Sequence, residues 1–132
     1  MFSDAELAYL DTQRLGRLAT QKPDGTLQNS PVGFSYNAEV GSIDIDGYNL
    51  EKSRKFRNVG ANGKAAFVVD DLASVSPWRV RCVEIRGQAE AIVAGDCASA
   101  LIRLHPTRII SFGITEPDAE AHNLTLDARD VS

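Results

Sequence analysis

The fold class follows from one stretch of sequence, LGRLATQKPDGTLQNSPVGFSY, at Leu15–Tyr36. Its two ends, Leu15–Thr20 and Thr26–Tyr36, are typical of β-strands. The connector QKPDG combines Pro, Asp and Gly, the residue types that suit a tight turn. We therefore expect two antiparallel strands joined as a hairpin near the start of the chain.

Four further segments have strand character. SIDIDG at Ser42–Gly47 alternates isoleucine with aspartate, which is the period of a half-buried strand. KAAFVVDD at Lys64–Asp71 and VRCVEIRGQAEAIV at Val80–Val93 are also expected to be strands. IRLHPTRIISFGI at Ile102–Ile114 predicts two strand fragments, separated by its His-Pro dipeptide.

Helical segments are few and short. Ser3, with Glu6 three residues later, forms a capping box that predicts a first helix. NLEKSRKFRNVGANG at Asn49–Gly63 is the strong internal helix, and its Gly and Asn-Gly signals mark its end. A short helical piece is expected near GDCASAL at Gly95–Leu101, and from Thr115 onward the polar, acidic chain predicts a loose tail.

Together these segments favour a mainly β (α+β) domain, a six- to seven-stranded antiparallel barrel with short helices at its ends. A chain of 132 residues with 43% hydrophobic content is large enough for one core. We expect residues 1–114 to form this barrel and residues 115–132 to be a polar C-terminal tail.

The acidic composition excludes several classes of protein. A net charge of −4 argues against nucleic acid as a partner, because binding phosphates needs a broad basic surface. The first residues lack the basic start and apolar core of a signal peptide, and the longest apolar runs are too short to cross a bilayer. Cys82 and Cys97 lack metal-site spacing and are expected to be free thiols. We therefore expect a cytoplasmic protein without a membrane partner.

No familiar set of catalytic side chains is present. Neither His105 nor His122 has a Cys or Ser partner in a recognisable motif, and no set of residues has zinc-ligand spacing. Phosphate-binding motifs of the Walker or G-x-G-x-x-G type are also absent. The catalytic residues are therefore unknown and no metal is expected, so an enzymatic reaction would depend on a bound cofactor.

A basic cluster, KSRKFR at Lys52–Arg57, contains four of the chain's fourteen Lys and Arg residues. If Ser53 is the N-cap, Arg54 and Lys55 occupy the first turn of a helix, where cations are unfavourable. A phosphate bound at that end would turn this cost into a favourable interaction. A solvated basic helix face explains the cluster equally well.

The strand that follows the first turn contains Pro31 and Gly33, which are poor residues for a central strand. A flat ring lying against exposed strand backbone would explain both residues, and so would an edge strand with a bulge. The single Trp, Trp78, either caps the core or lines a ligand cleft.

The long strand near Val80–Val93 mixes charged and apolar residues on both faces. One face would carry Arg79, Arg81, Val83 and Ile85, and the other would carry Val80, Cys82, Glu84 and Arg86. Such mixing is untypical of the wall of a monomeric barrel, so one face is expected to meet a partner subunit.

Several segments, in order, resemble the flavin/deazaflavin oxidoreductases of the split β-barrel superfamily, which includes the pyridoxamine 5'-phosphate oxidases. These segments are LGRLAT, DGTLQNSPVGFSY, GYNLEKSRKFRN, VRCVEIRGQAE and HPTRIISFGI, within Leu10–Ile114. The sequence is most similar to a short actinobacterial branch that uses coenzyme F420. The resemblance implies an FMN-binding split-barrel fold and a homodimer with two cofactors at the subunit interface.

The family's phosphate-binding residues can be placed on this sequence. In the oxidases, an Arg-Lys pair after a Ser at this helix start holds the FMN phosphate, which implies this role for Arg54 and Lys55. Lys52 and Arg57 would assist, reaching the longer anionic tail of F420.

The ring-binding part of the family site also has counterparts. The strand under the ring corresponds to Ser30, Pro31, Val32 and Gly33, and the positions before the phosphate pair correspond to Tyr48 and Asn49. For the hydrophobic wall of the substrate site we expect Trp78 and Phe112.

The sequence departs from the oxidases at two places. A Gln that contacts FMN in their fifth strand is replaced by Cys82, and their C-terminal Arg and His pair is absent. Pyridoxamine-phosphate oxidation is therefore not expected, and the deazaflavin is favoured over FMN.

The implied function is transfer of a hydride between F420 and an unsaturated organic small molecule. An FMN-dependent oxidoreductase of the same fold is the first alternative, and a non-catalytic flavin, haem or tetrapyrrole binding protein is the second. Tyr36, Tyr48 and solvent are equal candidates for the proton donor, and the sequence does not identify the substrate.

Overall fold

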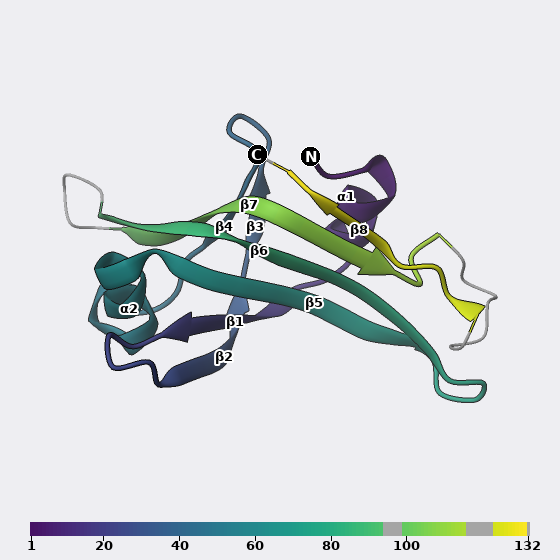
Figure 1. Ribbon diagram of the computed structural model, residues 1–132, viewed down its shortest axis with the longest axis horizontal. Coiled ribbons are helices and arrows are strands. Elements are labelled where there is room, and N and C mark those ends of the chain that lie inside the picture. The colour runs from purple at the N-terminus through teal and green to yellow at the C-terminus, as the bar shows by residue number, and fades with distance from the viewer. Residues whose placement is uncertain (94–98, 116–122, 132) are drawn as a thin grey trace.

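The computed structural model of the protein describes residues 1–93, 99–115 and 123–131 (Figure 1). The elements in chain order are α1 (Asp4–Asp11), β1 (Leu15–Gln21), β2 (Leu27–Gly33), β3 (Ser35–Asn37), β4 (Ser42–Ile45), the 3-10 helix η1 (Leu50–Lys52), α2 (Arg54–Asn62), β5 (Lys64–Ser74), β6 (Arg79–Val93), β7 (Ala100–Phe112) and β8 (Asp127–Asp130).

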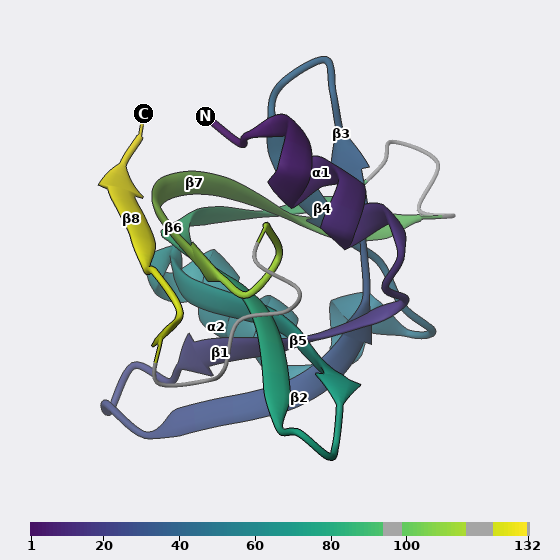
Figure 2. The same ribbon diagram turned by 90° about the vertical axis from the view of Figure 1, so that its right-hand side faces the viewer.

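The strands form one antiparallel sheet in the order β2-β1-β5-β6-β7-β4-β3, and β8 pairs with β7. The long strands β5, β6 and β7 run side by side along the molecule, and the short strands curl around to one side of them (Figures 1 and 2). The predicted mainly β fold with short helices is confirmed, and the described sheet has eight strands instead of six or seven.

The hairpin expected at Leu15–Tyr36 is present, but its second half is two strands. β1 pairs with β2 in unbroken register from Leu15↔Gly33 to Gln21↔Leu27. The turn is closed by Gly25, whose φ is +92°, and by the Asp24 carboxylate, which accepts from the Thr26 N–H at 2.9 Å. After Gly33 the chain leaves the β2 edge and forms β3 at the opposite edge of the sheet.

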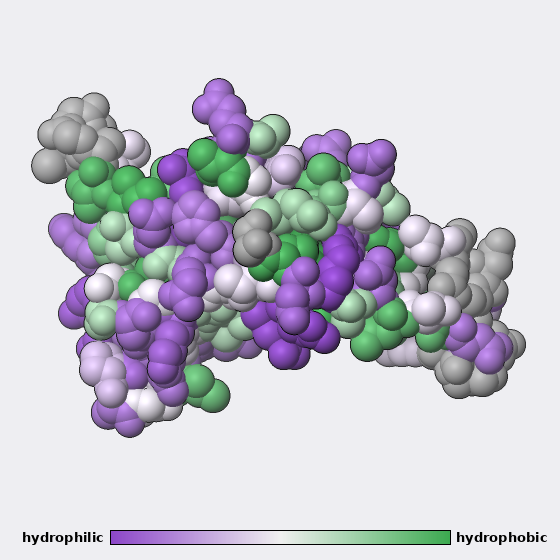
Figure 3. Space-filling model, turned by 45° about the horizontal axis from the view of Figure 1, so that its top comes forward, coloured by the Kyte–Doolittle hydropathy of each residue, from purple (hydrophilic) through white to green (hydrophobic). Residues whose placement is uncertain are grey.

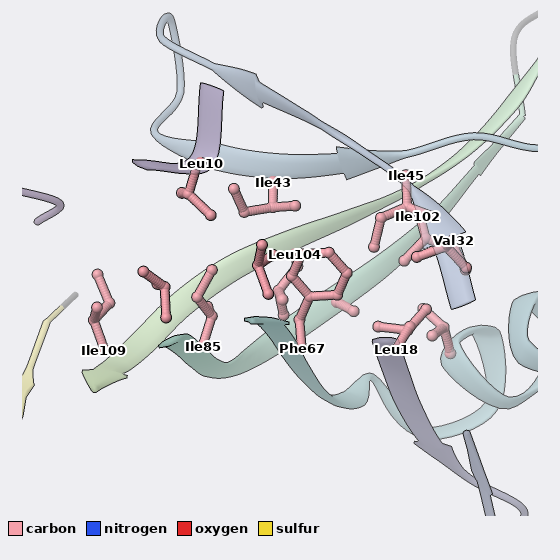
Figure 4. Packing of buried hydrophobic residues seen from close by; sticks show 14 of the residues in the cluster. Leu10, Leu18, Val32, Ile43, Ile45, Phe67, Ile85, Ile102, Leu104 and Ile109 are labelled. Atoms are coloured by element: carbon pink, nitrogen blue, oxygen red, sulfur yellow. The ribbon is translucent and has the colours of Figure 1, made fainter. Parts of the chain in front are cut away.

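The core lies between β1, β5, β6 and β7 on one side and β4 on the other. Phe67 lies near its centre, with Leu104 beside it and Leu18 and Val32 toward one end (Figure 4). Gly16 is required here, because a Cβ at this position would overlap the Phe67 ring. This packing places β1 against β5 and so fixes the hairpin on the barrel wall.

The internal helix is shorter than the sequence predicted. Ser53, with an extended backbone at φ −78° and ψ 155°, separates η1 from α2. The helix ends at Gly63 in the left-handed conformation, φ +69°, and Gly60 lies inside the helix. The shorter helix confirms Ser53 as the N-cap and places the basic cluster across its start.

The two strand fragments predicted at Ile102–Ile114 are one strand, β7, and that prediction is wrong. The pairing with β6 shifts between Arg86 and Gly87, and this bulge carries the chain past Pro106. Gly87 is needed because a Cβ there would overlap the carbonyl oxygen of His105. The helical piece predicted at Gly95–Leu101 falls largely outside the described residues, and its last two residues belong to β7.

The loose tail predicted from Thr115 is wrong for its last part, because β8 pairs with β7. Arg129 of β8 donates to both carboxylate oxygens of Glu6 in α1 and to the carbonyl oxygen of Met1. The two ends of the chain therefore lie close together (Figure 2). His122 and Cys97 lie outside the described residues.

Small groups of hydrophobic residues lie among hydrophilic ones over the face seen in Figure 3. No helix in the described part of the chain is long and apolar enough to cross a membrane.

Candidate cofactor site

The first turn of α2 combines a capped helix N-terminus with two cationic side chains. The Ser53 hydroxyl accepts a hydrogen bond from the Phe56 N–H at 3.2 Å and donates one to the Leu50 carbonyl at 2.6 Å. The turn contains no acidic residue, whereas Arg54 and Lys55 are its first two positions. The free N–H groups and the positive end of the helix dipole therefore coincide with two cations.

The four cations of the basic cluster have no hydrogen-bond or ion-pair partner among the described residues. Among the ion pairs within the described residues, six other arginines each contact a carboxylate: Arg17, Arg81, Arg86, Arg103, Arg108 and Arg129. A solvated helix face and an unfilled anion site both leave cations unpaired. Their position on a capped helix start, with no acid in the turn, favours the anion site.

The start of α2 lies near the turn between β1 and β2. Hydrogen bonds from Thr26 hold the pKa of Asp24 below its ordinary value, and the charges of Lys22 and Arg54 lower it further. Arg54 is therefore near enough to the turn to act on the Asp24 carboxylate.

A line of buried and partly buried hydrogen bonds joins α2 to the hairpin. The Asn58 amide donates to the Thr20 hydroxyl at 3.1 Å, and that hydroxyl donates to the Gln28 carbonyl oxygen at 3.0 Å. The Asn62 amide also donates to the Gln21 carbonyl at 2.7 Å. Helix α2, β1 and β2 are thereby fixed relative to one another.

Ser30, Pro31, Val32 and Gly33 lie on β2, an edge strand that pairs with β1 alone. The unbroken register shows no bulge, so Pro31 is explained by the edge position. Ser30 and Val32 share the inner face with Leu18 and Gly16, their partners on β1. The free edge of β2 leaves backbone N–H and C=O groups available to a ligand.

Two buried side-chain polar atoms among the described residues lack a hydrogen-bond partner: Ser30 Oγ and Asn58 Oδ1. They lie on β2 and α2, the two elements predicted to hold the ring and the phosphate of a cofactor. Buried polar atoms without a partner are uncommon and often mark an absent ligand or water. The unpaired cations, the free strand edge and the unpartnered Ser30 hydroxyl fit an aromatic group that carries an anion.

Two cavities continue the site along the chain. The first, which we call the α1 cavity, has a volume of about 860 Å³ and is lined by Leu7, Ala8, Leu10, Asp11, Gln13, Arg14, Gly33, Phe34, Ser35, Tyr36 and Asp46. The second, of about 570 Å³, is lined by Asp46, Gly47, Tyr48, Asn49, Glu51, Ser99 and Ala100. They share Asp46, so the predicted residues Gly33, Tyr48 and Asn49 line adjoining hollows.

The residues expected for the substrate wall lie elsewhere in the chain. Trp78 is in the turn between β5 and β6 and is 55% exposed. In Figure 1 this turn lies at the opposite end of β5 from α2. The eleven residues of β5 span about 33 Å from the first Cα to the last. Phe112, at the end of β7, lines a separate hollow with Val80 and Leu124. One chain therefore does not bring Trp78 or Phe112 to the cofactor residues.

Cys82 lies on the outer face of β6, opposite Asp70 and Phe112. Burial, with the negative charges of Asp70 and Glu84, raises the pKa of its thiol to about 11. The neutral thiol is therefore the form present at pH 7, which makes Cys82 a poor nucleophile. The alternation predicted for this strand is confirmed: Val83 and Ile85 are fully buried, and Glu84 and Arg86 pair outside.

The sequence did not predict the contribution of α1 to the cavity. Half of the lining comes from the last turns of α1 and from Arg14 just after it. The helix is fixed there because Asp71 accepts from the Tyr9 hydroxyl at 2.9 Å and pairs with Arg81. The contact between Tyr9 and Asp71 joins residues 62 positions apart, so no local signal in the sequence could have revealed it.

Comparison with known proteins places this sequence beside one family of proteins. The family model of pyridoxamine 5'-phosphate oxidase matches residues 2–125. The 5a,11a-dehydrotetracycline/5a,11a-dehydrooxytetracycline reductase of Streptomyces rimosus is 44% identical over 119 residues, covering 86% of this chain and 84% of the relative.

Solved structures share the architecture. An F420 reductase is 26% identical with a TM-score of 0.57, covering 73% of this chain and 88% of that one. A heme binding protein from Mycobacterium smegmatis has a TM-score of 0.71 at 17% identity, covering 98% of this chain and 59% of that one. An FAD binding protein from the same organism has a TM-score of 0.62 at 20% identity, covering 82% and 92%. At these last two identities the likeness shows the fold alone.

Proposed function

The chain belongs to the pyridoxamine 5'-phosphate oxidase family, and from this premise we propose that it is a cytoplasmic F420-dependent reductase of an unsaturated organic small molecule. The observation that carries the proposal is the unpaired cation cluster on the capped first turn of α2. The dehydrotetracycline reductase of S. rimosus and the F420 reductase structure support the reaction class and the cofactor.

In this proposal Arg54 and Lys55 bind the phosphate of F420 together with the free N–H groups of the first turn. Lys52 and Arg57 contact the anionic tail beyond the phosphate. The cost of four unpaired cations close together is then offset by charge-assisted hydrogen bonds, each contributing on the order of 1.5–3 kcal/mol.

The deazaflavin ring would lie along Ser30–Gly33, where the free edge of β2 offers backbone hydrogen bonds, with Tyr48 and Asn49 beside it. When bound, F420 supplies the hydride; a proton completes the reduction of one C=C bond, and the cofactor is oxidised by two electrons. Tyr36 is the better placed of the two candidate tyrosines to give that proton. It lines the α1 cavity with its ring against Phe2, whereas Tyr48 is 97% exposed.

We further propose a homodimer that packs through the outer face of the sheet. Apolar side chains on this face are only partly covered within one chain, and they include Ala19, Ala66, Val68, Val80, Ile110 and Phe112. A partner lying on this face would bury them, and one chain alone does not bring Trp78 or Phe112 to its own cofactor residues. The two residues expected for the substrate wall would then be supplied by the partner subunit.

FMN is the second candidate cofactor, because the same helix start would bind its phosphate. The replacement of the family's Gln by Cys82 removes an FMN contact and favours F420. A haem or tetrapyrrole carrier has no comparable support, since the likeness to the heme binding protein is one of fold.

The test is a titration of the purified protein with F420 and, separately, with FMN, followed by fluorescence quenching. The proposal predicts submicromolar F420 binding and much weaker FMN binding. Replacing Arg54 and Lys55 together by Ala should weaken F420 binding by about 3 kcal/mol or more, which is a hundredfold or more in Kd. Lys64→Ala, at an exposed unpaired cation after the helix, is the matched control and should leave Kd unchanged. An unchanged Kd in the double variant would reject the phosphate site, and tight FMN binding would change the cofactor.

A further inference from the structure

The α1 cavity adjoins the proposed ring site and shares one residue, Gly33, with it. Gly33, the last residue of β2, lines the cavity, and Asp46 joins it to the hollow that contains Tyr48 and Asn49. Its volume of about 860 Å³ is within the range of small-molecule sites, about 300–1,000 Å³. A second molecule could therefore lie beside a cofactor bound along β2.

The walls of this cavity are held in place from several directions. Glu6 at the start of α1 is bound by Arg129 and Ser111, and Tyr9 near its end is bound by Asp71. On the strand side, the Tyr36 ring packs edge-to-face on Phe2, with centroids 5.6 Å apart. A preformed hollow of this kind binds a ligand without first ordering its walls.

The lining divides into an apolar part and a charged part. Leu7, Leu10, Phe34 and Tyr36 supply the apolar surface. Asp11, Arg14 and Asp46 supply the charges, and none of the three has a hydrogen-bond or ion-pair partner in the described ranges 1–93, 99–115 and 123–131. In the same structure Asp44, Asp70 and Asp71 are each paired with an arginine. The cavity thus offers two free carboxylates and one free guanidinium around apolar side chains.

We propose that the α1 cavity binds the reducible substrate, and that this substrate is a largely apolar molecule with one cationic amine and one anionic oxygen. The amine would be bound between Asp11 and Asp46, and the anionic oxygen by Arg14. This inference rests on the proposed function for the identity of the reaction, but the cavity and its charges do not depend on the cofactor.

Tetracycline is a suitable probe, because it has a dimethylammonium group and an ionised enol on a ring framework, and because the 44% identical relative is a dehydrotetracycline reductase. Calorimetric titration measures its binding to the full chain, with and without F420, so the cofactor's own binding is a separate readout. The wild-type protein should bind tetracycline in the micromolar range, and F420 should not displace it.

A variant that fills the cavity tests the location. Ala8 is exposed on α1 and lines the hollow, so Ala8→Trp adds bulk there without disturbing the core. It should weaken tetracycline binding about tenfold or more while F420 binding changes less than about twofold. The matched control is Ala38→Trp in the exposed turn between β3 and β4, which should change neither.

Charge variants test the class of substrate. Arg14→Gln and Asp11→Asn should each weaken tetracycline binding about two- to fivefold, as expected for solvent-exposed ion pairs, and high salt should reduce the difference. Glu39→Gln, at an exposed acid outside the cavity, is the control and should have no effect.

Each outcome decides the proposal. Unchanged tetracycline binding in Ala8→Trp rejects the location, and a tenfold loss of F420 binding in that variant assigns the cavity to the cofactor instead. No wild-type binding of tetracycline below about 1 mM, with F420 bound, rejects the substrate class. If F420 does not bind but Ala8→Trp still abolishes tetracycline binding, the cavity proposal stands and the proposed function falls.

Discussion

Replacing Arg129 by Met should reverse the contribution of Glu6 to the pH dependence of stability. The Glu6 side chain is completely buried, and its carboxylate accepts hydrogen bonds from both terminal nitrogens of Arg129. The Ser111 hydroxyl, at 2.6 Å, and the Ser3 N–H, at 2.8 Å, complete its contacts. Met keeps much of the side-chain volume of Arg129 and removes the charge.

The direction follows from the causes of the pKa shift. Burial acts to raise the pKa of Glu6, but the hydrogen bonds from Arg129 and Ser111 outweigh it and hold the pKa below the ordinary 4.5. A lowered folded-state pKa contributes stability that is fully present above the unfolded pKa and is lost as pH falls through the folded value. Without Arg129, burial dominates and the pKa rises above 4.5. Glu6 then destabilises the fold increasingly as pH rises from about 5 to 8.

The size of the effect is that of a broken buried ion pair, about 3–5 kcal/mol near pH 7, because an uncompensated charge stays behind. For a domain of this size the melting temperature should fall by about 10–15 °C. If Arg129→Met does not fold, the double variant Glu6→Gln/Arg129→Met removes the stranded charge and should recover much of the loss.

Urea denaturation of both proteins between pH 5 and 8 measures the difference in unfolding free energy. Arg108→Met is the control, because its partner Asp130 is on the same strand pair but 84% exposed, so the change should cost less than about 1 kcal/mol. If the free-energy difference between wild type and Arg129→Met is constant across this pH range, Glu6 does not carry the buried charge described above.

Three further predictions concern the bulge, the helix contact and the thiol. Gly87→Ala should lower the free energy of unfolding, measured with urea, by about 2 kcal/mol or more, because the added Cβ would overlap the His105 carbonyl oxygen. The control is Gly47→Ala, where an added Cβ meets no other atom, and it should cost less than about 0.5 kcal/mol. Similar costs for the two variants would refute the close approach at the bulge. Asn58→Leu removes the hydrogen bond from α2 to Thr20, so it should lower the free energy of unfolding by about 1–3 kcal/mol and weaken F420 binding. Unchanged stability and unchanged affinity would show that this hydrogen bond does not position α2. In a Cys97→Ser background, iodoacetamide should alkylate Cys82 slowly at pH 7, and the alkylation rate should rise with pH toward a midpoint of about 11. A midpoint of this rate profile near pH 8.5, the value of an exposed thiol, would contradict the burial of Cys82.

Local features of the fold could be predicted because each depends on residues close together in sequence. The Pro-Asp-Gly turn, the Ser3–Glu6 capping box and the Ser53 N-cap are all present. The assignment to the oxidoreductases of the split-barrel family is also confirmed, by the family match and the 44% identical reductase.

Features that depend on distant partners could not be predicted. The break at Phe34 and the continuation of β7 through Pro106 are decided by which strands lie alongside, and β8 forms because β7 offers it a free edge. An interruption in a strand pattern looks the same in sequence whether the chain turns away or passes through a bulge.

The candidate site divides in the same way. The sequence predicted the cations at the start of α2, since their order along the chain is what makes them a cluster. It could not show that they lack partners among the described residues. In the ion pairs of these residues that join two different elements, the arginine and its acid are at least ten positions apart.

By itself, then, the sequence determined the hairpin, the capped helix with its cations, and the alternation of each strand, because these follow from backbone geometry over a few residues. Only the tertiary structure decided which charges are neutralised, which strand is left at an edge, and that α1 and the β2–β3 junction enclose a cavity. Those properties are set by packing between segments tens of residues apart, and no local pattern encodes that packing.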